Sequence, residues 1–97
     1  MNYKSIDEYI GKKIMDKRIE KRYTVVEMSE LLNVSRQGYY DYENGKTTIP
    51  SDRCVKLCKH LGIDYLQLMQ DALTYAQEII KKEAYENFFN KNDAEEQ

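Results

Sequence analysis

Four signals for helix starts and ends lie close together in the first half of the chain and leave few ways for it to fold. Thr24-Val-Val-Glu27 has the form of a capping box, in which a hydroxyl and a carboxylate each accept a hydrogen bond from an N–H group at a helix start. Asn33 tolerates the left-handed conformation that ends a helix, and Ser35 is a favourable cap for the next one. Asn44-Gly45 closes that helix. The spacing predicts two short helices, the second over about 36–43, joined by a tight turn.

Other apolar residues recur at three- and four-residue spacing, which is the period of an α-helix. Ser5-Ile-Asp-Glu8 is a second capping box, and it begins a helix whose apolar side continues to about Arg22. Ser51 is expected to cap a fourth helix, with Cys54, Val55, Leu57, Cys58 and Leu61 on its apolar side and Gly62 at its end. Asp64 resembles one more cap. No segment keeps the alternation of apolar and polar residues that is typical of a β-strand.

Beyond Met69 the apolar pattern becomes one long amphipathic stripe, from about Gln70 to Asn90. The predicted fold class is therefore all-α, with five helices and an additional C-terminal amphipathic helix. Residues 1–69 are expected to form one domain, residues 70–91 a helix that pairs two subunits, and residues 92–97 a disordered tail. The stripe residues expected to make the pairing contacts are Leu73, Ala76, Ile79, Ile80, Ala84 and Phe88.

The charge of the chain is unevenly distributed. Residues 1–60 carry twelve Lys and Arg against nine Asp and Glu, whereas residues 61–97 carry three against eight. A nucleic acid meets one face of a protein and not its average charge, so the net charge of −2 does not exclude DNA binding. Because no long apolar run or signal peptide is present, we expect a cytoplasmic protein whose two cysteines stay reduced.

From Ile10 to about Met69 the chain resembles the DNA-binding domain of lambda-type repressors, Cro proteins and Xre-like regulators. The residues that carry the resemblance are Ile10-Gly11, Ile14, Arg18, Thr24, Met28-Ser29, Leu32-Asn33-Val34-Ser35, Glu43-Asn44-Gly45-Lys46, Pro50 and Leu61-Gly62. The resemblance implies a five-helix domain whose third helix enters the major groove of double-stranded DNA and contacts base edges with its first residues. It also implies that Arg18 and Glu43 form a bridge that orients this helix.

On the same resemblance, Arg36, Gln37, Tyr40 and Asp41 are expected to read bases, because Arg suits the acceptors of guanine and Gln those of adenine. Phosphate contacts are expected from the start of the second helix, from the start of the third and from the loop after it. The residues concerned are Thr24, Ser35, Asn44, Lys46, Thr47 and Thr48. Val25 replaces the Gln that commonly contacts phosphate in this family, which removes one anchor and favours a modest affinity.

These residues predict a sequence-specific transcriptional regulator, expected to be a homodimeric repressor. A protein-interaction module on the same fold, such as an antitoxin or an antirepressor that binds a partner through its C-terminal helix, is the alternative. We expect no catalysis, because the single His allows no Ser-His-Asp set. We expect no metal or cofactor either: Cys54, Cys58 and His60 make an incomplete tetrahedral site, and the two thiols are better explained as core residues.

Overall fold

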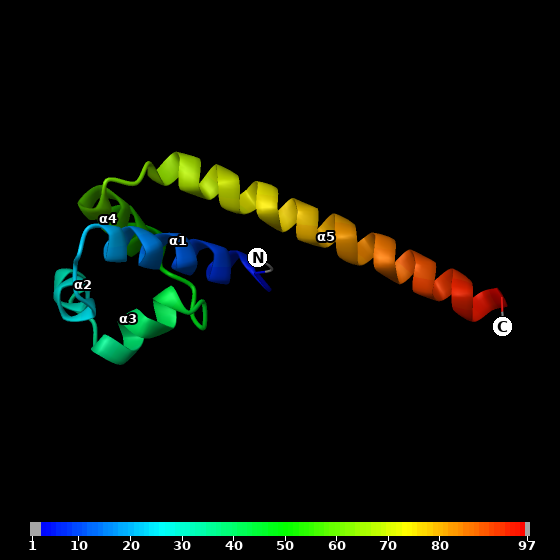
Figure 1. Ribbon diagram of the computed structural model, residues 1–97, viewed down its shortest axis with the longest axis horizontal. Coiled ribbons are helices and arrows are strands. Elements are labelled where there is room, and N and C mark those ends of the chain that lie inside the picture. Colours follow the sequence, from blue (N-terminus) through cyan, green and yellow to red (C-terminus); the bar gives the residue numbers. More distant parts are fainter. Residues whose placement is uncertain (1–2, 97) are drawn as a thin grey trace.

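The computed structural model describes residues 3–96, and among these residues it contains five helices and no strand. In chain order the helices are α1 (Ile6–Glu20), α2 (Val25–Leu32), α3 (Arg36–Glu43), α4 (Ser51–Leu61) and α5 (Tyr65–Glu96). Helix α1 is central and contacts α3, α4 and α5, while α2 packs against α3 and α4. Figure 1 shows the first four helices gathered at one end, with α5 passing α1 and continuing far beyond it. The all-α class is confirmed.

Local side-chain caps set the start of most of these helices. The hydroxyl of Thr24 accepts a hydrogen bond from the N–H of Glu27 at 3.1 Å, and the Glu27 carboxylate accepts one from the N–H of Thr24 at 3.2 Å. This reciprocal pair satisfies two N–H groups that have no partner within the helix. At the start of α1 the Ser5 hydroxyl accepts from the N–H of Glu8 at 3.2 Å. The expected caps therefore place α1 and α2 where the sequence predicted them.

The expected cap of α4 is wrong. Pro50 and not Ser51 is the cap residue, no side chain caps this helix, and Ser51 is its first helical residue. The extended backbone of Pro50 leads into the helix, and its carbonyl accepts the first helical hydrogen bond from the N–H of Cys54 at 2.9 Å. Because its ring fixes φ near the helical value, here −55°, Pro50 leads directly into a helix that begins at Ser51, one residue earlier than a serine cap would put it.

Helix α5 joins two segments that the sequence pattern suggested as separate. No Gly or Pro follows Gly62, so nothing interrupts the helical hydrogen bonds after Tyr65. The expected fifth helix and the expected additional helix are consequently one continuous helix of 32 residues, about 48 Å long. The segment expected to be a disordered tail is helical up to Glu96, and Gln97 lies outside the described residues.

All five helices contribute to one hydrophobic core. Its buried residues are Ile10, Ile14, Met28, Leu32, Tyr39, Tyr42, Cys54, Leu57, Cys58, Leu61, Leu68 and Ala72. The two cysteines are free thiols within it, 3% and 1% exposed, as their interpretation as core residues requires. Val55, expected on the apolar side of α4, is 46% exposed, because it lies about 100° around the helix from Cys54. None of the helices in the described part of the chain is long and apolar enough to cross a bilayer.

Helices α1 and α3 approach so closely that only glycine fits at one position of α1. A Cβ atom at Gly11 would lie 2.5 Å from the carbonyl oxygen of Glu43 and would also overlap the carbonyl oxygen of Tyr42. Both obstacles are backbone atoms at the end of α3, so a side-chain rotation cannot relieve the overlap. The end of α3 is thereby fixed against the middle of α1.

Gly11→Ala should therefore destabilise the fold, although alanine is the better helix former. We expect a loss of about 1–3 kcal/mol or more in the free energy of unfolding, the range for forcing atoms into a packed region. Urea unfolding followed by circular dichroism measures it. Lys12→Ala, one residue along α1 and away from α3, is the control and should leave stability nearly unchanged, because its ion pair with Asp16 is exposed to solvent. Equal stability of the two variants would contradict the close approach.

Candidate nucleic-acid interface

The turn between α2 and α3 is built by three residues with distinct tasks. Asn33 ends α2 in the left-handed conformation, with φ 55° and ψ 46°. The N–H of Val34 then donates to the carbonyl of Ser29 at 3.0 Å, which closes the turn. Ser35 begins α3, and its hydroxyl accepts from the N–H of Gly38 at 3.0 Å. The turn fixes the angle between α2 and α3, and so the direction in which α3 leaves the core.

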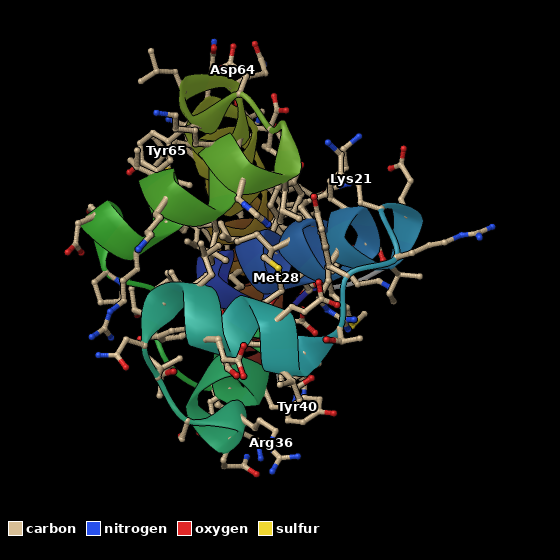
Figure 2. All side chains as sticks on the ribbon, turned by 90° about the vertical axis from the view of Figure 1, so that its left-hand side faces the viewer. Lys21, Met28, Arg36, Tyr40, Asp64 and Tyr65 are labelled. Atoms are coloured by element: carbon tan, nitrogen blue, oxygen red, sulfur yellow. The ribbon has the colours of Figure 1, made fainter. Side chains whose placement is uncertain are left out.

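Helix α3 divides into an inner and an outer side. Tyr39 and Tyr42 are buried in the core, 0% and 8% exposed, as their three-residue spacing requires. Arg36, Gln37 and Tyr40 are exposed on the outer side, and Asp41 is partly exposed there. Figure 2 shows Arg36 and Tyr40 at the outer end of the molecule, pointing away from the core around Met28. The structure thus brings the four expected base-reading residues onto one surface.

These four residues form two neighbouring pairs along the helix. Arg36 and Tyr40 are four residues apart and share a side, as do Gln37 and Asp41. The Gln37 amide donates to the Asp41 carboxylate at 3.0 Å. This bond holds the Gln37 side chain along the helix axis and leaves its carbonyl oxygen free to accept a hydrogen bond.

The start of α3 is electrostatically unusual within this chain. Helices α1, α2 and α4 each carry an acidic residue in the first turn, which complements the positive end of the helix dipole, whereas α3 and α5 carry none there, and of the five helices only α3 begins with a cation, Arg36. A cation at this position costs some helix stability, on the order of 0.3–1 kcal/mol. An anion that binds beside Arg36 removes this cost, so the start of α3 is prepared for phosphate or for the acceptor edge of a base.

The expected phosphate contacts fall into three places around α3. Ser35 is at its start, Thr24 is exposed at the start of α2, and the loop after α3 carries the remaining residues. Within that loop the N–H of Lys46 donates to the carbonyl of Asp41 at 2.9 Å, which turns the chain back. Asn44, Lys46, Thr47 and Thr48 are all exposed. None of the ion pairs among the described side chains includes Lys46 or Arg36, so both charges are available.

Two of the expected phosphate contacts are already hydrogen-bonded to carboxylates. The Thr48 hydroxyl donates to Asp7 at 2.8 Å, and the Thr24 hydroxyl donates to Glu27 at 3.0 Å. Either hydroxyl would have to leave its carboxylate to donate to a phosphate, and the carboxylate would repel that phosphate. Among the expected phosphate contacts, Thr24 and Thr48 are therefore less available than Lys46, which forms none of the ion pairs among the described side chains. The link from Asp7 to Thr48 spans 41 residues, and no local sequence signal indicates it.

Helix α3 is held in position by the bridge between Arg18 and Glu43. Arg18 Nε lies 2.6 Å from Glu43 Oε2 and Arg18 Nη2 lies 3.1 Å from Glu43 Oε1, which is a two-point contact. A third donor, Nη1, reaches the carbonyl of Tyr23 at 3.0 Å. The Arg18 side chain is 13% exposed and that of Glu43 only 2%. One guanidinium therefore ties the end of α1, the following loop and the end of α3 together.

Burial and charge around this bridge also affect the protonation of the neighbouring groups. The hydrogen bonds that the Arg18 guanidinium donates to Glu43 raise the pKa of Arg18 further above its ordinary value. Burial raises the pKa of the Tyr39 phenol, and the adjacent Glu43 carboxylate raises it further. Arg18 is therefore charged, and Tyr39 neutral, at neutral pH.

A contact that the sequence did not indicate supports α3 from another side. Arg53, on α4, donates from Nη1 to the hydroxyl of Tyr42 at 2.6 Å. Tyr42 thus buries its ring in the core and still has a hydrogen-bond partner for its hydroxyl, as buried phenols usually do. Arg53 and Tyr42 are eleven residues apart on separate helices, so neither periodicity nor capping could reveal the pair.

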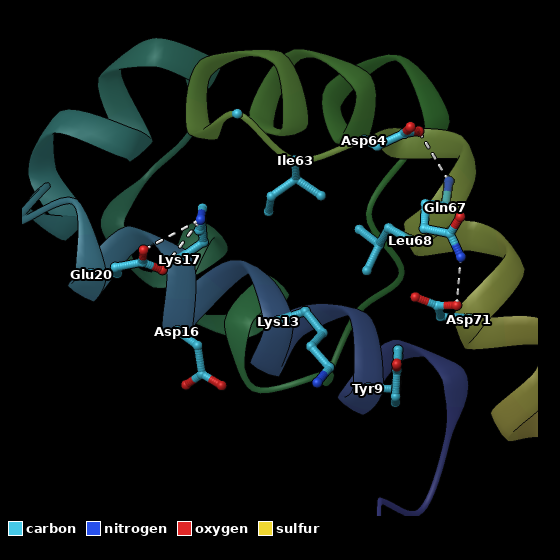
Figure 3. Close-up of a pocket in the computed structure, with 11 residues that line it drawn as sticks. Tyr9, Lys13, Asp16, Lys17, Glu20, Ile63, Asp64, Gln67, Leu68 and Asp71 are labelled. Carbon is cyan, nitrogen blue, oxygen red and sulfur yellow. Dashed lines mark hydrogen bonds and ion pairs between the residues drawn. The ribbon is translucent and has the colours of Figure 1, made fainter.

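A hollow of about 430 Å³ between α1 and the start of α5 lies apart from α3 (Figure 3). Its polar groups are largely paired with each other: Lys17 lies 3.3 Å from Glu20, and Gln67 donates to Asp71 at 2.9 Å. The Lys13 ammonium lies 5.2 Å from the centre of the Tyr9 ring. Charges of both signs line this hollow, so it presents no single-sign surface to DNA.

Short helices joined in this way, with an outward α3 bearing Arg, Gln and Tyr, define a helix-turn-helix DNA-binding domain. The helix-turn-helix family model HTH_3 matches residues 14–68, more than half of the chain. The chain therefore belongs to this family of Cro/C1-type, Xre-like DNA-binding transcriptional regulators, which confirms the resemblance drawn from the sequence.

Two solved structures are similar to this chain, both of the clp gene regulator ClgR from Corynebacterium glutamicum. In one, the match covers 74% of this chain and 94% of that chain, with 22% identity and a TM-score of 0.64. In the other, it covers 84% and 87%, with 21% identity and a TM-score of 0.64. At this identity the likeness concerns the fold alone. No curated protein matches the chain.

Breaking the Arg18–Glu43 bridge from one side should be strongly destabilising. Arg18→Met leaves the Glu43 carboxylate buried without its partner, and we expect a loss of about 3–5 kcal/mol in the free energy of unfolding, measured by urea denaturation. The double variant Arg18→Met/Glu43→Leu removes both charges and should lose much less than Arg18→Met alone. Lys17→Met, which breaks a more exposed ion pair with Glu20, is the control and should lose at most about 1 kcal/mol. A double variant as unstable as the sum of its single variants would contradict this account.

Proposed function

We propose that this protein is a sequence-specific repressor that inserts α3 into the major groove of double-stranded DNA as a homodimer. The observation that carries the proposal is the exposed, uncompensated Arg36 at the start of a helix whose opposite side is locked into the core. A rigid inner side and an outer side of long polar side chains are what base reading in the groove requires. A bound dimer represses by occupying DNA that other proteins need.

Base reading is assigned to the outer side of α3. Arg36 can donate two hydrogen bonds to guanine, and Gln37, already aligned by Asp41, can pair with adenine. Tyr40 is 45% exposed and is placed to contact a thymine methyl group or a phosphate. Asp41 can accept from cytosine, and it also disfavours sequences that bring a phosphate or carbonyl near it. Lys46 and the loop around it bind the phosphate backbone of the DNA without reading bases.

Two copies are needed for a stable complex because one short helix contacts only a half-site. The outer surface of α5 supplies the pairing contacts, since Leu73 is 57% exposed and Ile80 is 65% exposed. Ala84 and Phe88 are also exposed, and Ala76 is partly buried. Ile79, expected on the same surface, lies instead beside Tyr3 and Tyr75 on the domain side of α5. Half-sites about one helical turn apart, roughly 34 Å, follow from such a dimer.

Arg36 and Lys46 should differ in what their loss does to binding. On sequences selected from a random duplex pool, Arg36→Ala should relax base preference at one position, at a cost of about 1–3 kcal/mol. Lys46→Ala should weaken binding to all sequences alike and reduce the slope of log affinity against log salt by about one. Lys59→Ala, exposed on α4, is the control and should change neither quantity. If both α3 variants lose affinity equally on every sequence, Arg36 is not a reader.

Ile80→Lys should separate dimerisation from DNA contact. A lysine in the apolar surface of α5 should convert the dimer to a monomer at micromolar concentration, measured by sedimentation. Affinity for DNA with two half-sites should then fall at least tenfold, and affinity for a single half-site should not change. Lys82→Ala, two residues along α5, is the matched control.

A wild-type protein that is monomeric and fills only one half-site would exclude the homodimer. Failure of the wild type to bind any duplex at low salt, while a second protein binds residues 70–97, would favour the protein-interaction module instead.

A further inference from the structure

Helix α5 presents two apolar faces, and only one of them is used within the molecule. The first face packs on α1 and α4 through residues spaced four, three and four apart, which are Leu68, Ala72, Tyr75 and Ile79. Leu68 and Ala72 are buried, at 6% and 1% exposed. The ring of Tyr75 stacks on that of Tyr9 with centroids 5.1 Å apart, and its hydroxyl donates to the carbonyl of Tyr3 at 2.9 Å. These contacts fix nearly the first half of α5 on its own domain.

The second face repeats every seven residues. Leu66, Leu73 and Ile80 are 78%, 57% and 65% exposed, and Ala84 continues the series one turn later. At about 100° per residue these four positions lie within roughly 40° of one another and about 135° from the centre of the first face. The charged residues Lys81, Lys82 and Glu83 lie outside this narrow stripe. An uncharged stripe suits an apolar partner surface better than an acidic or a basic one.

An apolar groove of about 340 Å³ borders this stripe, between α1, α4 and the start of α5. Its apolar wall is made by Ile6, Ile10, Ile49, Cys54, Tyr65, Met69, Ala72 and Leu73. Leu73 belongs both to the wall of the groove and to the exposed stripe. The groove and the stripe are therefore one continuous apolar surface that begins beside α1 and ends on the protruding part of α5.

The protruding part of α5 has the length needed to cover such a groove. Residues 80–96 extend for about 25 Å at 1.5 Å per residue. The two shorter dimensions of the molecule are 26 and 22 Å. Figure 1 shows this part running away from the other four helices. A helix of this length can lie across a second copy of the domain but cannot fold back onto its own groove without breaking α5.

We propose that two copies pair through antiparallel α5 helices, so that the protruding part of each helix lies along the groove of the other copy. This inference rests on the homodimer proposed above and specifies its geometry. In a parallel pair the two protruding parts would contact each other, and both grooves would stay open. In the antiparallel pair the protruding part of each α5 covers the apolar surface of the other copy over its whole length. The two contacts are related by one two-fold axis, so the dimer is closed.

The pairing has a definite register. A two-fold axis between residues 76 and 77 sets Leu73 opposite the partner's Ile80 and Met69 opposite the partner's Ala84. The small side chain of Ala84 allows the two helices to approach closely above Met69. Residues 76 and 77 are uncharged, so no like charges meet at the axis.

Disulfide formation tests the register directly in the full chain, without DNA. Leu73→Cys and Ile80→Cys variants are oxidised separately and as an equimolar mixture, and covalent dimers are measured on a non-reducing gel. The antiparallel pair predicts strong cross-linking in the mixture and at least fivefold less in either variant alone. Met69→Cys mixed with Ala84→Cys should behave in the same way. Lys82→Cys, on the opposite side of α5, and the wild type, whose two cysteines are buried, are the controls and should not cross-link.

The other outcomes overturn the inference in distinguishable ways. Strong self-linking of Leu73→Cys alone and of Ile80→Cys alone shows a parallel dimer, which refutes the antiparallel geometry and leaves the proposed repressor dimer intact. No cross-linking in any sample, together with a monomer in sedimentation, refutes both the geometry and the homodimer. Neither result affects the assignment of α3 as the DNA-reading helix, which depends on the Arg36→Ala and Lys46→Ala measurements.

Discussion

The close contact between α1 and the end of α3 is the constraint on which the rest of the structure depends. At Gly11 the backbones of α1 and α3 lie so close that no Cβ atom fits. Seven residues further along α1, the Arg18 guanidinium donates two hydrogen bonds to the Glu43 carboxylate. The first contact sets the distance between the helices and the second sets the rotation of α3. Because Glu43 is at the last turn of an eight-residue helix, fixing it determines where Arg36, at the other end, points. A helix this short has little stability of its own, so its orientation comes from these contacts.

The inner side of α3 is packed into the core, whereas its first turn lacks the acidic residue that usually complements the positive end of a helix dipole. Tyr39 and Tyr42 are buried, and Tyr42 is further held by Arg53. On the outer side the first turn carries a cation where the other short helices carry an acid. A binding surface of this kind gives up some stability of the free protein, and the rigid core around it makes that loss tolerable.

Helix α5 has one apolar face that packs within the molecule and a second that does not. Its first face is satisfied by α1 and α4, so the domain does not need a partner in order to fold. Its second face and the adjoining groove are apolar and exposed, which is unfavourable in water. In the dimer proposed above, a second copy covers both, and the spacing between the two domains then follows from a rigid helix and not from a flexible linker.

The sequence alone determined the local part of this protein, namely the helices, their caps and the inward or outward direction of their side chains. Capping boxes, an Asn-Gly stop and helical periodicity act over a few residues, so they could be read directly for α1, α2 and α3. The Arg18–Glu43 bridge could be expected only through a family resemblance. Tertiary structure decided the rest: the approach at Gly11, the bonds from Asp7 to Thr48 and from Arg53 to Tyr42, and which of Ile79 and Ile80 faces the domain. Each of these depends on the three-dimensional relation between helices, which is set by how a whole core packs and has no signature in any short stretch of chain.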